Sequence, residues 1–119
     1  ITVITLDENF RKEMEPGAAP INERIEALRA LSELGCYTWV SIEPYPTPNI
    51  HEQDLQQILN RISFVNKIIF GRLHYNKLVS QYRNHQEFFN RCAKQVIAFC
   101  ENNHIDYHIK TGTLIEAEK

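Results

Sequence analysis

Short extended apolar segments alternate with helical patterns along the chain. Residues Ile1–Leu6 alternate in polarity and are rich in β-branched side chains, which is typical of a strand. Three more strands are predicted at Tyr37–Glu43, Lys67–Gly71 and Ile105–Lys110. Pro44 should close the second of these, because proline has no backbone donor. The apolar run in the third is typical of a strand buried on both faces of a parallel sheet.

Between these strands, apolar residues recur at intervals of three and four residues, as on one face of a helix. The predicted helices are a short one at Glu8–Met14, one opened by Pro20 and stopped by Gly35, one that Asn49 and Glu52 cap, and a longer one from Asn84 to Cys100. The polar stretch Leu73–Arg83 is expected to be irregular.

The order of elements is therefore β-(α)-α-β-α-β-α-β. Such alternation favours parallel strands joined by right-handed helical crossovers. No strand is followed by a glycine-rich phosphate-binding fingerprint, so a dinucleotide-binding fold is not expected. The sequence predicts one α/β domain over residues 1–119, with β/α units that form half of a partial TIM-type barrel.

Composition narrows the function classes only a little. The 119 residues fit one domain, and the apolar share of 43% and charged share of 24% are ordinary globular values. The net charge of −2 lacks the basic excess of a nucleic-acid scaffold. No apolar run reaches the roughly 18 residues of a membrane span. The chain starts at Ile1 rather than Met, so we expect it to be a trimmed or cut product.

The three cysteines predict reduced thiols. Cys36, Cys92 and Cys100 form no C-x-x-C pair, and an odd number without a signal peptide suggests a cytoplasmic protein. Cys92 and Cys100 lie two helical turns apart, about 12 Å, which is too far for a disulfide. Cys36 is predicted to be a small core residue.

Candidate ligand-binding residues lie near the carboxyl ends of the predicted strands, where barrel enzymes carry their chemistry. They are Thr2, Thr5, Ser41, Glu43, Arg72 and His74. Glu43 would accept a hydrogen bond from a ligand, or alternatively cap a helix or pair with Arg72. Arg24 lies in the first turns of its helix, and its residue type and position alone predict a solvated arginine on the helix surface. His104 and His108 have no metal-binding context and are expected to be a surface and a strand histidine.

Five segments together resemble the middle of radical S-adenosylmethionine proteins, in the spore photoproduct lyase-like branch often called DNA repair photolyases. These segments are Thr2–Asp7, Glu15–Ala18, Glu23–Gly35, Thr38–Pro44 and Ile68–Leu73. The family folds as a partial β/α barrel, and an N-terminal C-x-x-x-C-x-x-C motif holds its [4Fe–4S] cluster. This chain contains no such motif.

The resemblance therefore implies the C-terminal half of the barrel, without the metal-holding segment. It implies that Thr2, Arg24, Ser41 and Glu43 contact S-adenosylmethionine, with Arg24 at the ligand carboxylate. Arg72 and His74 would face the substrate. The sequence departs from the family in a threonine where serine is usual and in its Pro46-x-Pro48 loop.

Two classes of function remain open from the sequence. The first is a fragment of a radical enzyme that acts on nucleic acid or another macromolecule. Such a fragment would need the missing N-terminal half as its partner, or would form a homodimer through its open sheet. It would hold neither cofactor alone, and no catalytic or metal-binding residue is assigned. The second is a free-standing, non-catalytic α/β binding module.

Overall fold

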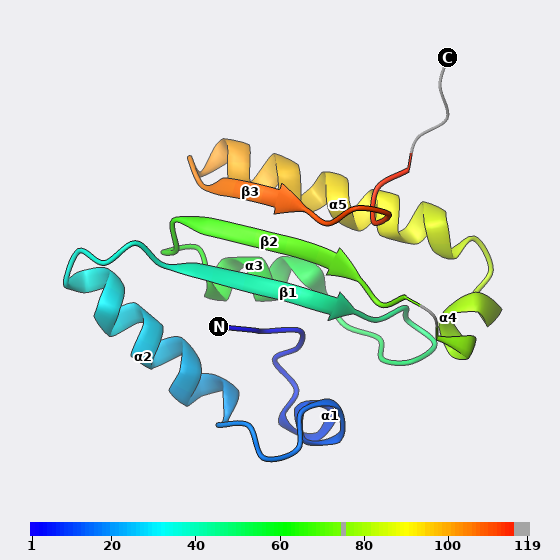
Figure 1. Ribbon diagram of the computed structural model, residues 1–119, viewed down its shortest axis with the longest axis horizontal. Coiled ribbons are helices and arrows are strands. Elements are labelled where there is room, and N and C mark those ends of the chain that lie inside the picture. Colours follow the sequence, from blue (N-terminus) through cyan, green and yellow to red (C-terminus); the bar gives the residue numbers. More distant parts are fainter. Residues whose placement is uncertain (75, 116–119) are drawn as a thin grey trace.

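The computed structural model describes residues 1–74 and 76–115, which form a mixed α/β domain (Figure 1). Its elements in chain order are α1 (Glu8–Met14), α2 (Ile21–Glu33), β1 (Trp39–Tyr45), α3 (Leu55–Arg61), β2 (Lys67–Arg72), α4 (Lys77–Gln81), α5 (His85–Asn102) and β3 (Asp106–Ile109). The alternation of strands and helices predicted from the sequence is confirmed in this coarse form.

The three strands form one parallel sheet in the order β1-β2-β3. The register aligns Val40 with Ile68 and Ile68 with Tyr107. Consecutive strands are therefore neighbours, each joined to the next through a helical connection (Figure 1). The predicted parallel sheet is confirmed.

The first predicted strand is reduced to a single bridge. Thr2 pairs with Ser41 in parallel, with backbone bonds of 2.9 Å from Val3 N to Ser41 O and of 2.8 Å from Ser41 N to Ile1 O. A strand that reaches Leu6 was therefore a wrong prediction. The chain turns earlier because the Thr5 hydroxyl accepts from Asp7 N at 3.0 Å, and Asp7 then caps α1.

Three predicted boundaries are corrected by local hydrogen bonding. Strand β1 runs through Pro44 to Tyr45, because its pairing with β2 shifts register between Ile42 and Tyr45 and needs no donor from the proline. Helix α3 is capped by Asp54, whose side chain accepts from Gln56 N at 2.9 Å, and not by Asn49. The polar stretch predicted to be irregular contains α4, which Asn76 caps.

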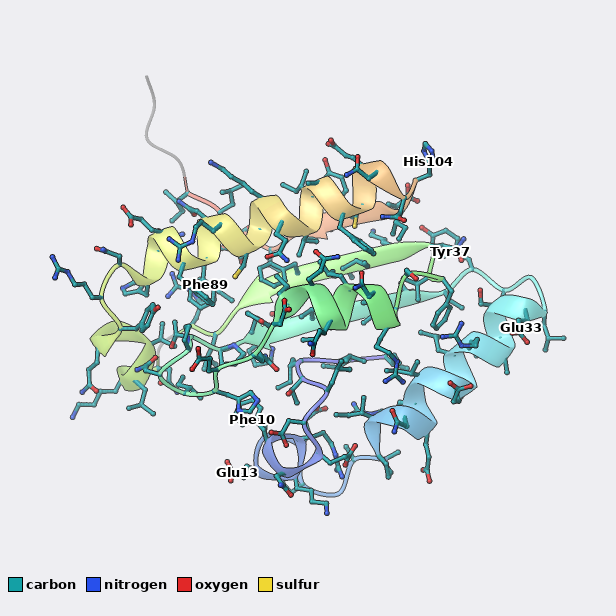
Figure 2. All side chains as sticks on the ribbon, turned by 180° about the vertical axis from the view of Figure 1, so that it is seen from behind. Phe10, Glu13, Glu33, Tyr37, Phe89 and His104 are labelled. Carbon is teal, nitrogen blue, oxygen red and sulfur yellow. The ribbon has the colours of Figure 1, made fainter. Side chains whose placement is uncertain are left out.

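Helices cover one face of the sheet. Figure 1 shows α3 and α5 behind the strands, and Figure 2 shows them in front from the opposite side. Along β1 and β2 every second side chain is fully buried in the common core, namely Val40, Ile42, Ile68 and Phe70. In the described ranges no helix lies over the opposite face of the sheet (Figure 1).

Helix α5 supplies much of this cover. Its 18 residues bury Phe89, Cys92, Ala93, Val96 and Cys100 beneath the sheet. Packing of this apolar stripe against β2 and β3 stabilises the helix more than its intrinsic propensity does. Neither α5 nor any other helix within residues 1–74 and 76–115 is long and apolar enough to cross a membrane.

Candidate functional site

The uncovered face of the sheet carries ordered rows of mixed side chains. Because side chains alternate along a strand, the residues between the buried positions point away from the helices. The register places Trp39, Lys67 and Asp106 in one row and Ser41, Ile69 and His108 in the next. Glu43, Gly71 and Lys110 follow at the carboxyl ends of the strands. We call this surface the open face.

Glu43 and Lys110 meet at the carboxyl end of the open face. The Lys110 Nζ lies 3.7 Å from Glu43 Oε2, and the two side chains are 48% and 36% exposed. Between them, Gly71 leaves the space that the Glu43 side chain occupies, since a Cβ there would lie 2.8 Å from its carboxyl carbon. Glu43 therefore pairs with Lys110 and not with Arg72, and it caps no helix in the hydrogen bonds described.

Thr2 and Ser41 lie side by side on adjacent segments. Their backbones form the parallel bridge between β1 and residues 1–4, which we call the first segment, and both residues are half-buried. Residues paired in this way project to the same side of a sheet. The structure thus brings together three of the predicted ligand residues, Thr2, Ser41 and Glu43, on the open face.

Arg24 is not the solvated helix residue that the simpler interpretation predicted. Its side chain is only 14% exposed, and Nη1 donates to the Thr2 carbonyl at 2.7 Å and to Glu15 Oε2 at 3.3 Å. Its Nε and Nη2 are buried and have no hydrogen-bond partner among the described residues. Arg24 therefore ties α2 to the first segment of the sheet.

Arg72 lies on the helix-covered side of β2, in alternation with Ile68 and Phe70. Its Nη1 donates to Gln86 Oε1 at 2.9 Å, and its guanidinium lies 4.4 Å from the ring centre of Phe89. Burial lowers the pKa of the guanidinium, which nevertheless stays charged. These contacts favour a structural role for Arg72 instead of the predicted substrate-facing one.

His74 follows β2 on the exposed loop that leads to α4. Its ring lies against Gly112, where a Cβ would come within 3.1 Å of His74 Cε1. His74 thus lies near the carboxyl end of the sheet, as predicted. His108 is exposed in β3 on the open face, and His104 is exposed after α5, so both of those predictions are confirmed.

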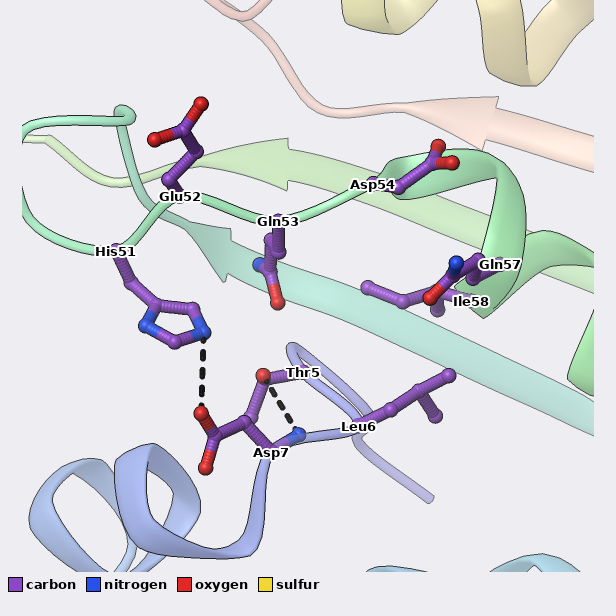
Figure 3. A pocket seen from close by; sticks show the side chains of 9 residues that line it. All are labelled: Thr5, Leu6, Asp7, His51, Glu52, Gln53, Asp54, Gln57 and Ile58. Carbon is purple, nitrogen blue, oxygen red and sulfur yellow. Dashed lines mark hydrogen bonds and ion pairs between the residues drawn. The ribbon is translucent and has the colours of Figure 1, made fainter.

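A cleft of about 320 Å³ opens beside the carboxyl end of β1 (Figure 3). The turn after the first segment and the loop after β1 form its walls, with Thr5, Leu6, Asp7, His51, Glu52, Gln53, Asp54, Gln57 and Ile58 as the lining. The His51 ring stacks on Phe10 at 4.2 Å, and its Nε2 lies 3.8 Å from Asp7 Oδ2. The lining thus places the carboxylates of Asp7, Glu52 and Asp54 in one cleft with the imidazole of His51.

Much of this polar lining already has a structural task. Asp7 and Asp54 cap α1 and α3. Gln53 donates through Nε2 to the Ile4 carbonyl at 2.9 Å, while its Oε1 is buried and has no partner among the described residues. The cleft thus fastens the loop after β1 to the first segment.

The cysteines are separated in the fold. Cys92 and Cys100 are buried on α5, where burial raises their pKa values to about 12 and about 11. Cys36 is exposed at the α2–β1 turn, so its prediction as a core residue was wrong. The turn at Gly35 directs it outward before the buried part of β1 begins. Within residues 1–74 and 76–115, no three histidines, cysteines or carboxylates are grouped as a metal site would require.

Comparison with known proteins adds one relative. Residues of this chain are 34% identical over 62 positions to the uncharacterized protein ORF301 of Acidianus two-tailed virus. The match covers 52% of this chain and 21% of that protein. No protein-family profile matches the chain, and no solved structure matches it significantly.

Sequence reasoning missed Lys110, Gly71 and His51 as members of these surfaces. The first two had a usable signal, because Lys110 lies two residues after His108 and Gly71 two after Ile69, each on one side of a strand. His51 had none. Its position depends on stacking with Phe10, which lies 41 residues earlier in the chain.

Proposed function

We propose that this chain is the C-terminal part of the barrel of a radical S-adenosylmethionine enzyme, with the open face as its inner wall. The observation that carries the proposal is the joint position of Thr2, Ser41 and Glu43 on that face. The sequence predicted all three as ligand residues, first from their positions on the expected strands and then from the resemblance. On the structure they lie on adjacent segments, with Glu43 at the carboxyl end of the sheet, where β/α barrels bind ligands, and Thr2 and Ser41 one row before it.

The arrangement of the layers supports the same proposal. The strands follow each other in chain order, and α3 and α5 cover one face only (Figures 1 and 2). A doubly wound fold would reverse its strand order and cover both faces. A barrel wall keeps the chain order and turns its bare face inward. In this proposal, the missing N-terminal half of the barrel covers the open face.

The side chains on the open face fit a nucleoside-type ligand. The hydroxyls of Thr2 and Ser41 can donate and accept, and the Glu43 carboxylate accepts from ribose hydroxyls or a base amine. Arg24 would reach a ligand carboxylate by exchanging its present partner Glu15. When bound together, the [4Fe–4S] cluster and S-adenosylmethionine supply one-electron radical chemistry, and this chain's residues hold and orient the ligand.

The chain's own cysteines do not fit an iron–sulfur cluster. Two of them are buried in α5 and protonated at neutral pH, since their pKa values are about 12 and about 11. A cluster needs several thiolates that converge on one point. In the proposed enzyme, the cluster ligands therefore come from the N-terminal half.

The test uses the complete protein that the proposal requires, extended upstream until it includes a C-x-x-x-C-x-x-C motif. After anaerobic cluster reconstitution and reduction, it should cleave S-adenosylmethionine to 5′-deoxyadenosine. Glu43→Gln should weaken binding of S-adenosylmethionine about 10-fold, as expected for the loss of a charge-assisted hydrogen bond. Glu26→Gln, an exposed change on α2, is the matched control and should bind normally.

Two results would overturn the proposal. One is a parent reading frame that has a start codon next to Ile1 and no cysteine motif upstream, which would favour a non-catalytic binding module. The other is a reconstituted, folded protein that neither binds nor cleaves S-adenosylmethionine.

A further inference from the structure

At Gly71 in β2, the side chain of Glu43 occupies the space that a side chain of residue 71 would fill. A Cβ built on Gly71 would lie 2.8 Å from both Cδ and Oε2 of Glu43 and 2.9 Å from its Cγ. Carbon and oxygen atoms do not approach that closely without displacement. The Gly71 backbone has no positive φ, in contrast to Gly17, Gly35 and Gly112. Space, and not backbone conformation, is therefore what glycine provides here.

The Glu43 carboxylate extends across this gap toward β3. It crosses from β1 over Gly71 and ends 3.7 Å from Lys110 Nζ. Lys110 immediately follows Ile109, the β3 partner of Phe70, and its backbone N donates to the Phe70 carbonyl at 2.8 Å. The two charged groups thus approach each other across the central strand, and both stay accessible at 36% and 48% exposure.

A long, exposed ion pair of this kind contributes little to stability. Its geometry matters in another way, because it presents an acceptor and a donor side by side at the carboxyl end of the open face. We infer that Gly71 and Lys110 are positioning and specificity residues of the ligand site proposed on the open face. Gly71 admits the Glu43 carboxylate over β2, and Lys110 holds it there. This inference rests on the proposed function.

The paired groups define the chemistry of the ligand that they would recognise. Glu43 accepts a hydrogen bond, and Lys110 donates one to a neighbouring acceptor. A polar edge with an adjacent donor and acceptor, as on a nucleoside base, satisfies both groups at once. A simple anion or a simple cation satisfies only one of them.

The first experiment tests the geometry without any ligand, in the 119-residue chain. Gly71→Ala is sterically mild for the backbone, because the clashing atoms are the far end of a flexible side chain. Crystal structures of the original chain and of this variant are compared. In the variant, the Glu43 carboxylate should be displaced from β2 and its contact with Lys110 should be broken. The thermal midpoint should be unchanged or slightly higher, since alanine suits a strand better than glycine.

The second experiment measures S-adenosylmethionine affinity in the complete, cluster-loaded protein. Gly71→Ala and Lys110→Met should each weaken binding about 3- to 10-fold, the range of one hydrogen bond lost from a site. In a Glu43→Ala background, which removes the clashing atoms, Gly71→Ala should have almost no further effect, because its action passes through the Glu43 side chain. Lys77→Met, an exposed lysine change on α4, is the matched control for the loss of charge.

The outcomes separate this inference from the proposed function. If Glu43 and Lys110 stay paired in the Gly71→Ala crystal structure, the inference is wrong whatever the protein binds. If Gly71→Ala weakens binding equally with and without Glu43, the positioning role is also wrong, although the proposed function survives. If the carboxylate moves but the loaded protein binds no S-adenosylmethionine, the proposed function fails, and with it the assignment of this pair to that ligand.

Discussion

Arg72→Lys tests whether the buried arginine of β2 is structural. The arginine is 8% exposed, and its guanidinium bonds Gln86 at 2.9 Å and stacks on Phe89 at 4.4 Å. Lysine keeps the charge but loses the planar fork that makes both contacts possible. Two longer contacts, from Nε to the Leu73 carbonyl at 3.4 Å and between Nη2 and His85 Nδ1 at 3.3 Å, add less.

The expected loss of stability follows from these contacts. A hydrogen bond to a charged group contributes about 1.5–3 kcal/mol, and a partly buried cation–π contact adds about 0.5–2 kcal/mol. Lysine can recover part of the first, so we expect Arg72→Lys to lower the free energy of unfolding by about 1–3 kcal/mol. For a domain of this size that corresponds to roughly 3–6 °C in thermal midpoint per kcal/mol.

Urea unfolding followed by far-ultraviolet circular dichroism measures this loss. The single tryptophan, Trp39, is 46% exposed and gives a second probe of the same transition. Arg83→Lys, an exposed change before α5, is the matched control and should stay within about 0.5 kcal/mol. If Arg72→Lys and Arg83→Lys unfold at the same urea concentration, the contacts of Arg72 do not stabilise the fold. The predicted substrate-facing role would then explain this residue better.

Three further predictions address other parts of the molecule. Glu8 accepts from Ile21 N and from Arg11, each at 2.6 Å, and these contacts lower the pKa of its carboxyl group. A carboxyl group whose pKa is lowered in the folded state adds stability above its unfolded pKa, so at pH 7 the original chain should unfold at a higher urea concentration than Glu8→Gln. This difference in urea midpoint should vanish as the pH falls well below 4.5, and a difference that stays constant would contradict the reasoning. With a thiol reagent at pH 8, Cys36 alone should react quickly in the folded chain, and all three cysteines in denaturant; fast reaction of all three in the folded chain would mean that α5 opens readily. The isolated chain should associate, as light scattering across a concentration series would show, because among residues 1–74 and 76–115 no helix covers the open face and β3 ends the sheet as an edge strand; a persistent monomer would refute that expectation.

Much of the fold follows from local patterns in the sequence. The continuous apolar run at Lys67–Gly71 and the helical stripe before Cys100 each favour one kind of element, and both formed as predicted. Their alternation then implied parallel strands, since a helical crossover returns the chain in the same direction. Boundaries were less predictable. Pro44 lies inside β1 because a register shift removes the need for its missing donor, and pairing across strands is not encoded locally.

The membership of the candidate site was only partly accessible from the sequence. Thr2, Ser41 and Glu43 could be placed together because strands alternate and parallel strands end at a common edge. The same alternation puts Arg72 on the covered side, although its place at the end of β2 had favoured a ligand role. The partners of Arg24 and Glu43 required the tertiary structure. Each depends on a side chain that reaches across to a distant segment, and only packing decides which of several oppositely charged groups it meets.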